Sequence, residues 1–107
     1  MKALILAIAL SFSILPAISA SVFMPKNIEQ GIKTTAKLKW PNDFQMQKYV
    51  IDLQTEAYYE VRYYKNKKVP TKILKSIIDR ARIKWPGDYQ MQSYVIKNQV
   101  SAYLAIN

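Results

Sequence analysis

Asp43 and Asp88 are the only acidic residues of this 107-residue chain that recur at a spacing of 45, and each follows a Trp-Pro pair. Two carboxylates could support acid–base chemistry, but a glycosidase needs them about 5 to 10 Å apart in one cleft. Both aspartates are better explained as caps of helices that begin directly after them. Histidine and cysteine are absent, so the commonest proton shuttle, thiol nucleophile and transition-metal ligands are missing. We therefore expect a protein that is not an enzyme and that needs no cofactor or metal.

Basic residues form a second group that could bind a ligand. From Arg62 to Lys84 there are nine basic residues and one acid, a balance of +8. Such a run is typical of a solvated helix face, or of a footprint for lipid headgroups, an acidic wall polymer or an acidic protein. The residues predicted to contact an anionic partner are Arg62, Lys65, Lys67, Lys68, Lys72, Lys75 and Arg82.

A 27-residue segment occurs twice in the chain. Residues 36–62 return as residues 81–107, and 14 of the 27 aligned positions are identical. A weaker similarity upstream extends the two units to residues 24–62 and 69–107, with a linker at 63–68. Such a repeat indicates one folding unit that is used twice.

Each unit reads as a short helix, a Trp-Pro corner and a longer helix. A residue before proline is pushed out of the α region, so the corner ends the first helix. The following aspartate then starts the second helix, since its carboxylate accepts free backbone N–H groups. The corner residues are Trp40, Pro41, Asp43, Trp85, Pro86 and Asp88. The predicted fold is all-α, with two tandem helix-turn-helix hairpins and four helices.

Two stripes run along the first long helix. We expect the stripe of Met46, Tyr49, Val50, Leu53, Ala57 and Tyr64 to face the core. The neighbouring stripe of Asp43, Gln47, Ile51, Gln54 and Tyr58 is identical in both units. The candidate partner residues on it are Gln47, Gln54, Tyr58, Gln92, Gln99 and Tyr103. These side chains could pair where the two long helices meet across a pseudo-twofold axis, line a groove for a ligand or protein, or join whole chains, for example in a homodimer.

Residues 1–20 resemble a secretory signal peptide. Lys2 precedes an apolar run from Ala3 to Leu15, and small residues follow Pro16. We expect export to the periplasm or the medium, with an N-terminal anchor in the inner membrane as the alternative. The single helical domain would then be residues 21–107. Export also disfavours nucleic acid as a partner.

The motif Trp-Pro-x-Asp-[Phe/Tyr]-Gln-Met-Gln-x-Tyr resembles a helix of small, uncharacterised bacterial proteins that are often exported. This resemblance implies a bacterial source and no particular activity. The expected function is that of an exported basic binding protein of the bacterial envelope or secreted fraction, which contacts an anionic surface or partner. The alternative is a protein-binding adaptor or inhibitor that uses the glutamine and tyrosine stripe.

Overall fold

Four helices and no strand make up residues 23–107, which are the residues that the computed structural model describes. The helices are α2 (Lys26–Lys39), α3 (Phe44–Arg62), α4 (Thr71–Lys84) and α5 (Tyr89–Ile106). The predicted all-α fold of two helical hairpins is confirmed. The predicted signal peptide lies outside the described residues. Among the helices of residues 23–107, none has the length and apolar character needed to cross a membrane.

The Trp-Pro corners have the same backbone conformation in both hairpins. Asn42 and Gly87, the residues after each proline, have φ values of 64° and 77°. This left-handed region favours glycine and, among other residues, asparagine, which explains why these two types alternate at one position. Asp43 and Asp88 then accept hydrogen bonds from the backbone N–H groups three residues later, at 3.0 and 3.1 Å. The predicted helix starts are confirmed.

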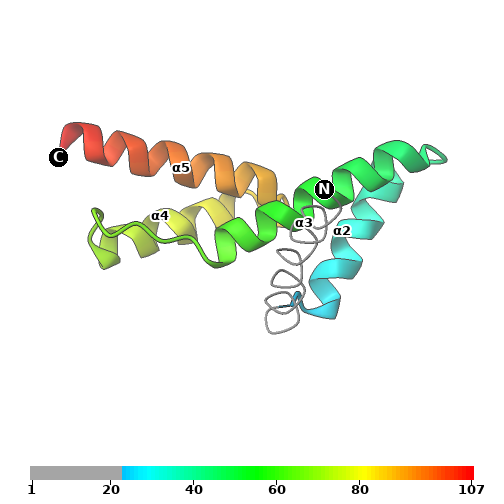
Figure 1. Cartoon of the computed structure of the whole chain (residues 1–107), viewed down its shortest axis with the longest axis horizontal. Helices are drawn as coiled ribbons and strands as arrows, with labels where there is room; N and C mark the ends of the chain where they lie inside the picture. The colour runs from blue at the N-terminus through cyan, green and yellow to red at the C-terminus, as the bar shows by residue number, and fades with distance from the viewer. Residues whose placement is uncertain (1–22) are drawn as a thin grey trace, which may run out of the picture.

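Helix α3 belongs to both halves of the molecule. It packs against α2 in its own hairpin and against α5 in the next, and α5 packs against α4 (Figure 1). The resulting body is elongated, with extents of 51 × 38 × 23 Å and a radius of gyration of 17.4 Å. A compact domain of this size would have a radius of about 13 Å. The molecule is therefore two joined hairpins rather than a four-helix bundle.

A continuous cluster of buried apolar residues lies in the second hairpin. Val69, Ala81, Ile96 and Val100 form one cluster there, and Val61 of α3 completes it. In the first hairpin the buried apolar residues of α2 and α3 are Ile32, Ala36 and Ala57, apart from Val61 itself. The second hairpin thus depends on a residue of the first for its core.

The predicted core stripe of α3 is partly wrong. Tyr49 is 58% exposed, whereas Gln47 of the neighbouring stripe is only 8% exposed. Burial of an amide is tolerated when it is hydrogen-bonded, and the Gln47 amide donates to the Trp40 carbonyl at 2.8 Å. A helical wheel predicts that Gln47 is exposed, because it takes account of polarity and not of the hydrogen bond to Trp40.

Candidate functional site: the glutamine stripe and the basic cleft

Two glutamines of the stripe brace the corners of their own hairpins. Gln47 Nε2 donates to the Trp40 carbonyl at 2.8 Å, and Gln92 Nε2 donates to the Trp85 carbonyl at 2.7 Å. Both glutamines are buried. The corner carbonyls precede proline, and each also accepts a hydrogen bond from the backbone N–H of the following aspartate at 3.2 Å. The side-chain amides of Gln47 and Gln92 are therefore used for hydrogen bonds within their own hairpins.

Gln54 joins the two hairpins at the start of α5. Its Oε1 accepts a hydrogen bond from the Tyr89 backbone N–H at 2.8 Å, and its Nε2 donates to Asp88 Oδ1 at 3.1 Å. A helix start has free N–H groups that need acceptors, and a side chain from another helix supplies one here. Gln54 is therefore a second cap of α5, added to Asp88.

Gln99, the counterpart of Gln54, is exposed on α5. A pseudo-twofold axis would bring Gln99 to the start of α3, just as Gln54 lies at the start of α5. No side chain of residues 23–107 other than Asp43 bonds to that start. The predicted pseudo-twofold arrangement is wrong, since the two long helices meet head to tail, with the second half of α3 against the first half of α5.

The tyrosines of the stripe also differ between the hairpins. Tyr58 lies edge-on to Tyr89, with ring centroids 5.2 Å apart. Tyr103 packs instead against the buried cluster of the second hairpin. Both are half-buried.

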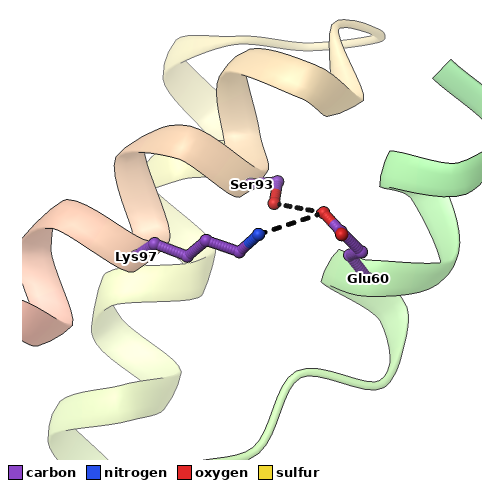
Figure 2. A network of polar contacts seen from close by, with 3 residues as sticks. All are labelled: Glu60, Ser93 and Lys97. Carbon is purple, nitrogen blue, oxygen red and sulfur yellow. Dashed lines mark hydrogen bonds and ion pairs between the residues drawn. The ribbon is translucent and has the colours of Figure 1, made fainter. Parts of the chain in front are cut away.

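A polar network crosses the same junction (Figure 2). Ser93 Oγ donates to Glu60 Oε1 at 2.8 Å, and Lys97 Nζ lies 3.4 Å from the same oxygen. The Ser93 hydrogen bond, with a smaller contribution from Lys97, holds the pKa of the Glu60 carboxyl below its usual value of 4.5, against a partial desolvation. The carboxylate therefore stays charged where α3 meets α5.

Two of the predicted anion-binding residues share a cleft. Arg62 and Arg82, from different hairpins, line a cavity of 740 Å³ together with Tyr58, Tyr89 and Asp79. Burial raises the pKa of the Tyr89 phenol above its usual 10.0, Tyr58 adds to this rise and Arg82 opposes it. The phenol is thus a neutral hydrogen-bond donor at physiological pH beside two guanidinium groups.

The other basic candidates lie outside this cleft, along the linker and α4. All seven predicted residues are exposed. Of the seven, Lys75 alone forms an ion pair within the described residues, with Asp79 at 2.7 Å, and residues 1–22 contain no acid. The Arg62 guanidinium lies 5.5 Å from the centre of the Tyr63 ring, a cation–π contact.

Sequence reasoning did not find Tyr89, Ser93, Lys97 or Glu60 as junction residues. At all four positions the two units differ: their counterparts are Phe44, Lys48, Asp52 and Ala105. A prediction based on positions that are identical in both units does not include these four residues. These four residues differ between the copies, and they act at the junction beside Gln54 and Tyr58, which are identical in both copies.

Within residues 23–107, no group of three or more acidic side chains is arranged to hold a metal ion. Comparison of the chain with known protein families, curated proteins and solved structures found no match.

Proposed function

We propose that this protein is an exported binding protein that contacts an anionic surface through its linker and α4. The observation that carries the proposal is the set of seven exposed basic side chains, six of which have no acidic partner within residues 23–107. Unpaired cations at a surface raise the local concentration of anions and attract anionic lipid. The rest of the described chain is close to neutral, so an anionic surface is attracted to the linker and α4 rather than to the whole molecule.

The spread of these residues favours an extended surface over a small ligand. Lys72 and Arg82 lie ten residues apart on α4, which is about 15 Å along a helix. Lysines on flexible stems suit delocalised contact with many headgroups or repeating anionic groups. We therefore favour a membrane rich in anionic lipid. A soluble acidic polymer or an acidic protein is an alternative outcome of the test.

The cleft of Arg62 and Arg82 adds a place where one headgroup could be held more closely. Two guanidinium groups and the Tyr89 phenol are all donors suited to phosphate oxygens. Asp79 on the same wall disfavours several anions at once. The cleft is thus secondary to the lysines in this proposal.

Vesicle co-sedimentation of the full chain tests the proposal. Binding should be strong on vesicles with anionic lipid, weak on zwitterionic vesicles, and lost as salt is raised. The double variant Lys68→Ala/Lys72→Ala should bind about 30-fold more weakly, since each lysine near the surface contributes about 1 kcal/mol. The matched control is Lys37→Ala/Lys39→Ala on α2, which removes the same charge elsewhere. Equal binding to both vesicle types at low salt, or equal loss in both variants, would contradict the proposal.

A further inference from the structure

The junction between the hairpins has two different sides. One side, which we call the plug face, consists of Gln54, Tyr58 and Val61 on the second half of α3. The other, which we call the socket face, consists of the corner and helix start at Ile83, Asp88 and Tyr89, together with the hairpin behind them. Because the units are similar in sequence, each contains residues for both faces. The chain uses only the plug of the first unit and the socket of the second.

The unused plug is on α5. The counterparts of the first plug are Gln99, Tyr103 and Ile106. Tyr103 is half-buried against the cluster of its own hairpin, so the exposed part of this plug is Gln99 and Ile106. Gln99 is exposed, and Ile106 is 81% exposed, whereas its counterpart Val61 is buried. An isoleucine at this position is slightly larger than the valine it corresponds to and equally apolar.

The unused socket is on the first hairpin. Phe44 is 73% exposed, whereas its counterpart Tyr89 is half-buried. Leu38 and its counterpart Ile83 are both exposed, at 77% and 79%, so Phe44 is the residue that distinguishes the two sockets. The backbone N–H of Phe44 has no side-chain acceptor within residues 23–107, whereas the N–H of Tyr89 has Gln54. Among residues 23–107, the same helix start is thus closed by a plug in one unit and open in the other.

A cavity in the first hairpin corresponds to the place that Val61 fills in the second. Val61 packs with Val69, Ile96 and Val100. The counterparts of those three residues, Met24, Ile51 and Thr55, line an open cavity of 390 Å³. An apolar side chain in the position of Val61 is what this cavity lacks.

Charge permits a plug to enter the open socket. The first unit, residues 24–62, has six basic and five acidic residues, whereas residues 63–107 have nine basic and two acidic ones. The network of Glu60, Ser93 and Lys97 is not repeated, but its counterparts Lys48 and Asp52 pair with each other at 2.7 Å. The first unit is therefore close to neutral, so the basic plug-bearing half meets little net charge there, and Lys48 and Asp52 already neutralise each other.

We infer that a second copy of this chain inserts its α5 plug into the open socket of the first hairpin, so that chains join head to tail as the two hairpins do. Gln99 of the incoming copy then caps α3, and Ile106 fills the cavity. A contact between two different faces leaves one plug and one socket free at the ends. The assembly grows as a chain or closes as a ring, and repeat proteins without polar end units behave in this way.

Two half-blocked variants test the inference by sedimentation velocity of the full chain at high salt. Ile106→Asp removes the plug and leaves the socket, and Phe44→Asp removes the socket and leaves the plug. Each variant alone should lose all species larger than a monomer. Their mixture should form a 1:1 complex and nothing larger, because only one plug and one socket remain compatible.

Tyr63→Asp is the matched control, since Tyr63 is an exposed aromatic that belongs to neither face, and it should assemble like the original chain. Circular dichroism melts check that all variants fold. If the Ile106→Asp and Phe44→Asp variants still assemble, the inference is overturned. Association through the apolar residues 3–15 would give that result. A mixture that stays monomeric overturns it too. High salt removes anion binding, so this outcome is independent of the proposed function.

Discussion

The starts of α3 and α5 share one local sequence but have different surroundings. Both follow a Trp-Pro corner, both begin after a left-handed residue, and both are capped by an aspartate. At α5 the cap is doubled by Gln54, and Tyr89 is half-buried. At α3 no second cap is present within the described residues, and Phe44 is exposed. The comparison teaches that the repeat specifies the corner, whereas burial of the corner depends on a preceding unit.

The same contrast holds for the isoleucine in the middle of each long helix. Ile96 is 1% exposed, and its counterpart Ile51 is only half-buried. Their helices are alike, but Ile96 is covered by Val61 and Ile51 borders an open cavity. Packing in the second hairpin should therefore contribute more to the free energy of unfolding than packing in the first.

Truncation of the two isoleucines gives the largest expected effect. Ile96→Ala should lower the free energy of unfolding by about 2–5 kcal/mol, because it leaves a cavity in the one continuous cluster. Ile51→Ala should cost about half as much, since its side chain already borders open space. Urea denaturation at low protein concentration measures both. Equal losses would show that the two hairpins are equally well packed.

Truncation of Gln54 and of its counterpart Gln99 should have a smaller effect on stability, but the difference between the two variants should be clearer. Gln54→Ala should destabilise the fold by about 1–3 kcal/mol, because Asp88 and the Tyr89 N–H lose a partly buried partner. Gln99→Ala should leave the unfolding of the monomer within about 0.5 kcal/mol of the original, as exposed positions usually do. Thermal unfolding followed by circular dichroism compares the two. A similar loss in both variants at low concentration would contradict the unequal roles of the two glutamines.

Much of the fold could be predicted from periodicity and corner chemistry. Trp-Pro-x-Asp predicts the break and the new helix, because proline and an N-terminal carboxylate act on their immediate neighbours. The end of α3 is harder to predict: the sequence would allow the helix to run to Tyr64 or Lys65, but it ends at Arg62. Nothing in the local sequence stops it there.

The core face could not be predicted in the same way. Gln47 is buried because its amide bonds to a carbonyl seven residues earlier, and Tyr49 is exposed because neither α2 nor α5 covers it. Both facts depend on how α2 and α5 meet α3, and a wheel for a single helix lacks that information. The seven basic residues were easier, since exposure is the ordinary state of lysine and arginine. That Arg62 and Arg82 share a cleft follows from the packing of two hairpins, which the sequence does not give directly.

The smallest expected effect concerns the one junction contact that the open socket cannot reproduce. The pKa of Glu60 is lowered in the folded chain, so its contribution to stability is present above the usual value of 4.5 and is lost as pH falls through the lower folded value. Glu60 is 42% exposed, which limits the contribution to less than about 1 kcal/mol. Glu60→Gln should therefore narrow the difference between melting temperatures at neutral and strongly acid pH, and the matched control Glu56→Gln should not. If Glu60→Gln leaves that difference unchanged, the network of Glu60, Ser93 and Lys97 adds nothing to the internal junction. Its absence at the proposed junction between chains would then cost nothing, and the remaining differences between the two junctions would lie in residue pairs such as Val61 against Ile106 and Tyr89 against Phe44.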